Sequence, residues 1–232
     1  MVGLTMDLQR RALPSLVFGV VVVGGLLAAS CGSSGSPAAP ASVNAAQSAV
    51  QVVAVGCRSA DVHGAGLMVG DGRVATVAHV VAGATRLEVR GVHGTAAATV
   101  VYFDPILDLA VLKVDPRLAT PVPIGDAASG DQGTVTVYRD DAPVQLTAEV
   151  RRPVQINTAD IYGLGKHLRP GYELNLDIRP GDSGAVVVVG GKAVALLWAT
   201  SKEAAARTWA MRASLLTDHL TDSAPVDNGH CT

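Results

Sequence analysis

The stretch Arg179-Pro180-Gly181-Asp182-Ser183-Gly184-Ala185 holds a serine between two glycines at the edge of an apolar run. A serine hydroxyl is a poor nucleophile at its free pKa, so it needs a general base within hydrogen-bond reach and a group that orients the base. Glycines let a backbone turn sharply and direct N–H groups at a developing oxyanion. We therefore interpret Ser183 as a candidate nucleophile, and the N–H groups of Gly181 and Ser183 as a candidate oxyanion hole.

Two upstream segments offer the partners that such a serine requires. Thr76-Val77-Ala78-His79-Val80-Val81 offers His79 as the base, and Asp108-Leu109-Ala110-Val111-Leu112 offers Asp108 as the orienting carboxylate at the start of a strand. Asp104 is a competing carboxylate, but its position before Pro105 is typical of a turn residue. The sequence thus predicts a catalytic set of His79, Asp108 and Ser183.

These three motifs, in the chain order His, Asp, Ser, resemble the chymotrypsin-like (trypsin-like) serine protease family. The resemblance implies an all-β fold of two Greek-key six-stranded β-barrels with a short C-terminal helix. It assigns the N-terminal barrel to residues 49–130, and the C-terminal barrel, helix and tail to residues 131–232. It also implies a serine endopeptidase that works through an acyl-enzyme on protein or peptide substrates, without a cofactor. The pattern is most similar to bacterial envelope stress proteases and actinobacterial membrane-tethered proteases.

The resemblance further implies a set of substrate-binding positions. Trp198 and Ala199 match the strand that pairs with an extended substrate. Asp177 matches the floor of the primary specificity pocket, where an acid favours Arg or Lys; its alternative role is a structural carboxylate at a strand end. Ala199 and Thr208 stand where trypsin-like enzymes have glycine, which narrows the pocket.

Several residues depart from the family pattern and leave other functions open. Ala185 replaces the second glycine after the serine, and the activating N-terminal Ile-Val-Gly-Gly is absent, so Asp182 needs a different partner. A protease fold that no longer cleaves and serves as a binding or sensing module is the main alternative. An esterase-like hydrolase and a lipid-anchored structural protein are the others.

Composition agrees with a β-rich protein that does not bind nucleic acid. Aromatic residues make up only 3% of the chain, so a core of small aliphatic side chains is expected, and the net charge of −2 gives no basic surface. Alternating apolar residues predict most of the strands, and Asp71-Gly72 predicts a hairpin turn. Residues 151–172 show no clean alternation, and we expect a loop there.

The N-terminal residues 1–31 have the layout of a signal peptide, lipoprotein signal or membrane anchor. Arg10-Arg11 precede an apolar run from Leu16 to Ala29, which is shorter than a spanning helix needs. Cys31 follows at the position of a lipidated cysteine, so a lipid anchor, an uncleaved helix and free secretion are the three possibilities. Each predicts an extracytoplasmic domain, and the lipid anchor and the helix would hold it at the cell membrane. Residues 32–48, rich in Gly, Ser, Pro and Ala, predict a flexible linker.

Two further cysteines remain if Cys31 is lipidated. Cys57 and Cys231 then form an even pair in an oxidising compartment, where a disulfide is the simplest use and two free thiols are the alternative. The sequence contains no cysteine or histidine spacing typical of a zinc site, so no metal is expected.

Overall fold

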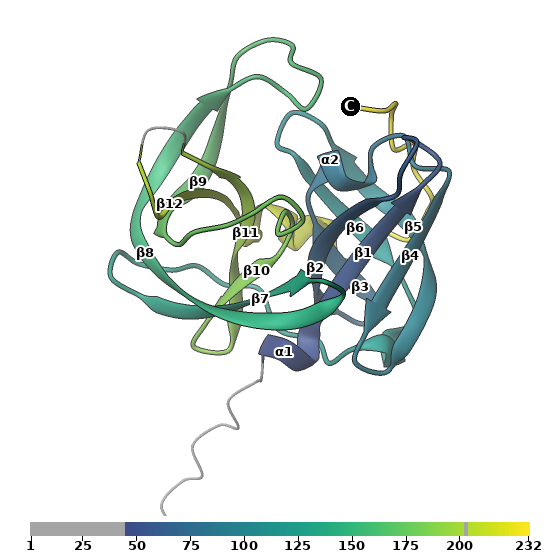
Figure 1. Cartoon of the computed structure of the whole chain (residues 1–232), viewed down its shortest axis with the longest axis horizontal. Helices are drawn as coiled ribbons and strands as arrows, with labels where there is room; N and C mark the ends of the chain where they lie inside the picture. Colours follow the sequence, from purple (N-terminus) through teal and green to yellow (C-terminus); the bar gives the residue numbers. More distant parts are fainter. Residues whose placement is uncertain (1–44, 202–203) are drawn as a thin grey trace, which may run out of the picture. The chain divides into compact units, whose positions relative to one another are not determined.

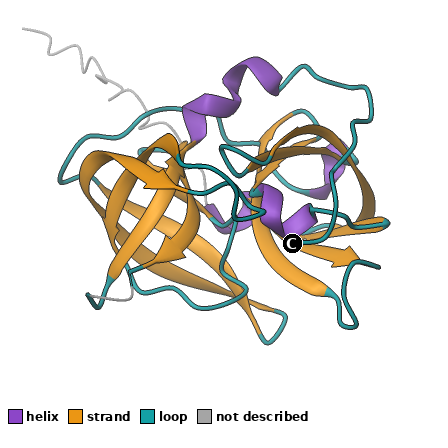
Figure 2. Ribbon diagram, turned by 90° about the horizontal axis from the view of Figure 1, so that it is seen from above, coloured by secondary structure: helices purple, strands orange, loops and turns teal. Residues whose placement is uncertain are grey.

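The computed structural model describes residues 45–201 and 204–232, which form two closed six-stranded β-barrels (Figures 1 and 2). The all-β, two-barrel architecture predicted from the sequence is therefore confirmed. The predicted anchor at 1–31, with Cys31, and most of the predicted linker lie outside the described residues. No helix in the described part of the chain is long and apolar enough to span a bilayer.

The first barrel contains strands β1 to β6, drawn in purple to teal in Figure 1. Their bounds are β1 (Ala49–Val55), β2 (Val62–Gly70), β3 (Arg73–Thr76), β4 (Arg86–Gly91), β5 (Gly94–Asp104) and β6 (Leu109–Lys113). They are ordered β1-β2-β3-β6-β5-β4, and antiparallel pairing of β1 with β4 closes the barrel. The predicted Asp71-Gly72 turn joins β2 to β3, with Gly70 opposite Arg73 and Gly72 at φ +65°.

The second barrel contains strands β7 to β12. Their bounds are β7 (Gln132–Arg139), β8 (Ala142–Thr158), β9 (His167–Asn175), β10 (Val186–Val189), β11 (Lys192–Thr200) and β12 (Arg207–Arg212). They are ordered β10-β11-β12-β9-β8-β7, and β10 pairs with β7 to close the barrel.

The loop expected at residues 151–172 is mostly strand, and the sequence analysis was wrong there. Residues 151–158 continue β8, and β9 begins at His167. Between residues 151 and 158 no side chain is fully buried: Val154, Ile156 and Thr158 are half-buried and the others are exposed, so this part of β8 has only a short, weak apolar face. Pairing with β9 along its length holds it in place instead.

The core consists almost entirely of valine, alanine and leucine, as the low aromatic content predicts. One cluster fills the second barrel, around Val135, Leu174 and Leu197. The other fills the first barrel and also includes Val186 and Met211 of the second barrel, so apolar packing is continuous across the two barrels. This shared core fixes the loops of one barrel against those of the other.

The flexible linker predicted to reach residue 48 ends earlier than expected. Residues Ala45–Ser48 form the short helix α1, with Ala45 and Ser48 buried. Their small side chains fit closely against the barrels, and the carbonyl of Gln47 accepts a hydrogen bond from the N–H of Thr120 at 3.0 Å. These four residues therefore belong to the folded domain.

The C-terminal segment contains the expected short helix, which is a 3₁₀ helix, η2 (Ala213–His219). Ser214 lies in its first turn, and its hydroxyl donates to a carboxylate oxygen of Asp126 at 2.9 Å. A second 3₁₀ turn, η1 (Pro116–Leu118), follows β6. After η2 the chain runs back along the first barrel, where the N–H of Val226 donates to the carbonyl of Val100 at 3.0 Å. The tail, grouped with the second barrel in the sequence analysis, thus packs against the first.

Candidate active site

His79 lies on the short helix α2 (Ala78–Val81), which follows β3 directly. Its neighbours Ala78, Val80 and Val81 are buried in the first barrel, and this apolar set holds the turn in place. The histidine is the one polar residue of the turn, and its side chain remains 31% exposed. The imidazole is therefore fixed at its base and open to solvent at its edge.

Asp108 lies immediately before β6, where it is 1% exposed and adopts a left-handed backbone with φ +57°. Both carboxylate oxygens contact His79: Oδ1 accepts its backbone N–H at 2.8 Å, and Oδ2 lies 2.8 Å from Nδ1. A carboxylate at Nδ1 fixes the tautomer in which Nε2 is left as the proton acceptor. Asp104 is a turn residue, as predicted, because its Oδ1 accepts the N–H groups of Ile106 and Leu107.

Ser183 sits in a tight loop between β9 and β10. The flanking glycines have left-handed backbones, with φ +97° at Gly181 and +82° at Gly184, which other residues rarely adopt. The N–H of Ala185 donates to the carbonyl of Asp182 at 3.1 Å, and the N–H of Gly184 donates to Leu197 at 2.9 Å. Ser183 and Gly181 are half-exposed, whereas Asp182 is buried, so the loop presents the serine outward.

The serine loop and the histidine helix meet at β2 of the first barrel. The carbonyl of Ser183 accepts the N–H of Ala65 at 2.8 Å. A Cβ atom added to Gly64 would lie 2.7 Å from Val80 and 3.1 Å from the carbonyl oxygen of Ser183, so both segments lie against this glycine. The structure thus brings the three residues of the predicted catalytic set to the junction of the barrels.

Asp182 has an arginine as its partner. Its Oδ2 lies 2.9 Å from Nη2 of Arg139 at the end of β7, and the same oxygen accepts the N–H of Arg179 at 2.9 Å. Asp182 is 1% exposed and Arg139 24% exposed. The sequence analysis showed that Asp182 needs a partner but did not find Arg139, because the loop of Asp182 and the end of β7 are far apart in the sequence.

Ala185 does not disturb the serine loop. Its backbone φ is not positive, so this position does not require glycine. The side chain is fully buried in the core of the second barrel, and the carbonyl accepts the N–H of Leu197 at 2.8 Å. The extra methyl group is therefore packed in the core.

The predicted substrate-binding residues lie in different environments. Trp198 and Ala199 are half-buried on β11, next to a bulge in its pairing with β12. Asp177 is exposed in the segment after β9. Thr208 is fully buried on β12, and its hydroxyl donates to the carbonyl of Leu176 at 2.7 Å.

Arg169, on β9, is a charged residue near the site that sequence reasoning missed. It is 1% exposed, its Nη1 lies 4.0 Å from Oδ2 of Asp108, and its guanidinium lies 5.0 Å from the ring centroid of Trp198. Burial lowers the pKa of the Arg169 guanidinium from its ordinary value, and the negative charges of Asp108, Asp104 and Asp160 oppose that effect. Residue 169 fell in the stretch expected to be a loop, so no strand pattern drew attention to it.

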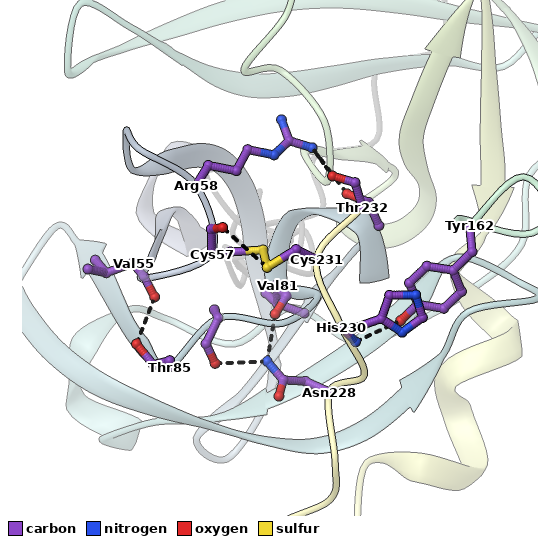
Figure 3. Close-up of a disulfide and its surroundings, with 11 residues drawn as sticks. Val55, Cys57, Arg58, Val81, Thr85, Tyr162, Asn228, His230, Cys231 and Thr232 are labelled. Carbon is purple, nitrogen blue, oxygen red and sulfur yellow. Dashed lines mark hydrogen bonds between the residues drawn. A yellow bond between two sulfur atoms is a disulfide. The ribbon is translucent and has the colours of Figure 1, made fainter.

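The C-terminal tail holds the segment after His79, as Figure 3 shows. Cys57 and Cys231 form the expected disulfide, with an S–S distance of 2.06 Å. Beside it, the side-chain amide of Asn228 donates to the carbonyls of Val81 at 2.7 Å and Ala84 at 3.1 Å. Within residues 45–201 and 204–232, no cluster of His, Cys, Asp and Glu could hold a metal ion.

A histidine–carboxylate pair and a glycine-flanked serine loop at the junction of two barrels are the arrangement expected of the serine-hydrolase class. Comparison with known families agrees with this class: residues 64–196, more than half of the chain, match the trypsin-like peptidase domain. The chain therefore belongs to the family of trypsin-like peptidase domains.

Individual relatives and solved structures support the same family. The chain is 29% identical over 177 residues to the serine protease Rv3671c of Mycobacterium tuberculosis, a match that covers 72% of this chain and 44% of that protein. The chain thus spans less than half the length of this curated relative. The crystal structure of the active form of the Rv3671c protease superimposes with a TM-score of 0.73 at 27% identity, covering 81% of this chain and 86% of that one.

A more distant likeness concerns the fold alone. The HtrA-type protease AlgW, solved with a tripeptide, has a TM-score of 0.62 at 22% identity and covers 75% of this chain and 59% of that one. The two-barrel fold is therefore shared with HtrA-type proteases.

Proposed function

We propose that this protein is a cell-envelope-anchored serine endopeptidase that hydrolyses peptide bonds through His79, Asp108 and Ser183. The observation that carries the proposal is the double contact of Asp108 with His79, which leaves Nε2 free to act as a base beside the serine loop. Membership of the trypsin-like peptidase domain family adds support. The serine-protease description of its mycobacterial relative points the same way.

In the proposed mechanism, Ser183 Oγ attacks the substrate carbonyl while His79 takes its proton and later returns it to the leaving amine. Asp108 keeps the imidazole in the required tautomer and stabilises its positive charge. The N–H groups of Gly181 and Ser183 would bind the oxyanion, and a Cβ added to Gly181 would meet no atom within 4 Å, so the loop leaves room there. In the second half of the reaction, water attacks the acyl-enzyme while His79 takes its proton, and His79 then returns that proton to Ser183 Oγ.

Substrate binding is assigned to β11. An extended peptide would add to the strand at Trp198 and Ala199, which are half-buried and next to a bulge. Asp177, being exposed, remains a candidate for contact with a basic side chain. Thr208 would act indirectly, because its buried hydroxyl fixes the backbone at Leu176.

The membrane part of the proposal rests on the sequence of residues 1–31, with Arg10-Arg11, the apolar run and Cys31. A disulfide between Cys57 and Cys231 is compatible with an oxidising compartment outside the cytoplasm. Lipidation at Cys31 is the form of anchor that we propose. This is tested by measuring the incorporation of radiolabelled palmitate into the wild-type protein and Cys31→Ala. We expect the variant to lose the label, and equal incorporation would argue for another kind of anchor.

The hydrolytic function is tested by incubating the protein with a diverse peptide library and identifying the products by mass spectrometry. Ser183→Ala and His79→Ala serve as matched controls. We expect new peptide termini with the wild-type protein and none with either variant. A folded wild-type protein that yields no products would favour the alternative of a binding or sensing module.

A further inference from the structure

Arg169 is the most deeply buried cation in the described residues, and its hydrogen bonding is incomplete. Its side chain is 1% exposed, yet Nε and Nη1 are buried without a hydrogen-bond partner. A buried charge and unpaired donors both oppose folding, so packing alone gives no reason for an arginine here. The charged groups around Arg169 offset this cost.

The charge of Arg169 lies next to the carboxylate of the proposed catalytic set. Nη1 is 4.0 Å from Oδ2 of Asp108, the same oxygen that contacts Nδ1 of His79. Two opposite charges that are both buried attract each other more strongly at this distance than at the surface. Asp104 and Asp160 add negative charge around the guanidinium, so the arginine balances an acidic cluster of which Asp108 is the buried member.

Two further contacts fix the plane and position of the guanidinium. Nη2 donates to the carbonyl of Ala159 at 2.6 Å, in the loop between β8 and β9. One face lies over the ring of Trp198 on β11, 5.0 Å from the centroid. A guanidinium held at one edge and lying over an aromatic ring has little freedom to rotate. Arg169 therefore connects Asp108, which belongs to the first barrel, with two elements of the second.

We propose that Arg169 is a positioning residue for the reaction: it holds the carboxylate of Asp108 directed at His79, and it couples that carboxylate to the strand that carries Trp198. This inference rests on the proposed function of His79, Asp108 and Ser183. Arg169 itself does not touch the substrate, because its side chain is buried behind Trp198 and Asp108.

The test measures how fast a fluorophosphonate labels the full chain as a function of pH. Arg169→Met removes the charge with similar volume, and Arg169→Lys keeps the charge without the planar guanidinium. Arg152→Met is the matched control, because Arg152 pairs at 2.7 Å with Glu173, another buried carboxylate on β9. Each variant is first shown to be folded by circular dichroism and its rate is measured well below its unfolding temperature.

We expect Arg169→Met to label about tenfold more slowly than the wild type at neutral pH, because the positive charge 4.0 Å from Asp108 is lost. We also expect the acid limb of its rate profile to move to higher pH. The reason is that a cation beside Asp108 Oδ2 opposes the addition of a proton to the Asp108–His79 pair. Arg169→Lys should keep the acid limb of the wild type and recover most of the rate. Arg152→Met should label at the wild-type rate with an unchanged profile.

The possible results separate the inference from the function on which it rests. A folded Arg169→Met protein with the rate and acid limb of the wild type would overturn the positioning role while leaving the protease function intact. An equal loss of rate in Arg152→Met would also overturn it, since the effect would then follow from the loss of any arginine paired with a buried carboxylate of this barrel. A folded wild-type protein that is not labelled at any pH would overturn the proposed function, and the inference with it.

Discussion

At the scale of single residues, the backbone of Asp108 carries information about its role. A left-handed conformation is uncommon outside glycine, and aspartate and asparagine tolerate it better than most residues. Here φ is +57°, and this geometry brings both carboxylate oxygens to His79. The left-handed backbone of Asp108 and its two side-chain contacts therefore both serve to hold His79.

This match predicts different effects for two substitutions of Asp108. Asp108→Asn should fold normally, because asparagine accepts the left-handed backbone, but label with a fluorophosphonate about 10³- to 10⁴-fold more slowly. Asp108→Ala should lose the same activity and about 1 kcal/mol of stability in addition. Urea unfolding and labelling kinetics of both variants check this, and an active Asp108→Asn would contradict the role given to the carboxylate.

The ion pair between Arg139 and Asp182 predicts that removal of the arginine lowers the stability of the protein, because its partner Asp182 is buried. Arg139→Met leaves a carboxylate that is 1% exposed without its cation, and we expect about 2 kcal/mol lower stability and slower labelling. The estimate is below that of a fully buried pair because Arg139 is partly exposed. Adding Asp182→Asn to Arg139→Met should restore part of the stability.

The exposed pair of Arg117 and Asp115 is the control for this prediction. Arg117→Met should leave the urea midpoint unchanged, because an exposed ion pair is screened by solvent. Equal destabilisation by Arg117→Met and Arg139→Met would show that the Asp182 pair has no special part in holding the serine loop.

At the scale of secondary-structure elements, α2 depends on a segment far away in the sequence. The helix is a single turn, too short to be stable alone. Asn228 in the C-terminal tail binds two carbonyls at its end, and the N–H of Gly83 donates to the carbonyl of Asn228 at 3.0 Å. Gly83 is left-handed at φ +66°, with the backbone of Cys231 directly beside it. The tail thus acts as an external cap for the turn that carries His79.

Removal of this cap should loosen α2. We expect Asn228→Ala to lower stability by about 1–2 kcal/mol, since two partly buried carbonyls lose their donor. Amide hydrogen exchange should rise most at residues 79–84. Asn175→Ala, which removes an amide from the exposed side of β9, is the control and should leave exchange at α2 unchanged. An unchanged exchange rate in Asn228→Ala would mean that the tail does not support the histidine turn.

Motifs and apolar alternation predicted most of the elements, because these signals are local. The Asp71-Gly72 hairpin, α2 at His79 and the strand after Asp108 all follow from residues that are neighbours in sequence. The end of β8 was missed because Val154 and Ile156 are the only residues that give it an apolar face, which is too short a local signal. Arg139 and Arg169 were also missed, because an arginine gives no sign of which distant carboxylate it will meet. Which carboxylate a buried arginine meets depends on how the strands close into barrels, and this cannot be predicted from neighbouring residues in the sequence.

At the scale of the whole molecule, the two ends of the domain are tied together. The disulfide joins Cys57, directly after β1, to Cys231, and closes a loop of 174 residues. The hydroxyl of Tyr138 on β7 donates to the carbonyl of Ala49 on β1 at 3.0 Å, which is a further link between the barrels. The domain is therefore held by links between residues far apart in the chain.

Loss of the disulfide should lower stability strongly. In the chain-entropy account, a loop of this length contributes about 5 kcal/mol. We expect a Cys57→Ser, Cys231→Ser double variant to unfold at a markedly lower temperature in calorimetry than the oxidised wild type. Reduction of the wild type should give the same midpoint as the double variant, and equal midpoints for oxidised and reduced protein would contradict the account.

Two half-buried tyrosines, Tyr138 and Tyr102, predict a loss of stability in alkali. Burial raises the pKa of Tyr138 to about 12, and burial together with Asp104 raises the pKa of Tyr102 to about 12, from an ordinary value of 10. Both side chains remain neutral in the folded state at a pH where the unfolded chain ionises. Stability is thus kept below pH 10 and falls as the pH rises from about 10 to about 12. Urea midpoints across this range should fall less steeply in Tyr138→Phe, and an equal slope would refute the assignment.

The central claim, that Ser183 is the activated nucleophile of this fold, is tested most directly by mapping a covalent adduct. The full chain is treated with a fluorophosphonate, its intact mass is measured, and the modified residue is located by peptide fragmentation. The account predicts one adduct per chain, on Ser183, and none in folded His79→Ala. An adduct on a different serine, or unmodified Ser183 in a folded wild-type protein, would contradict it.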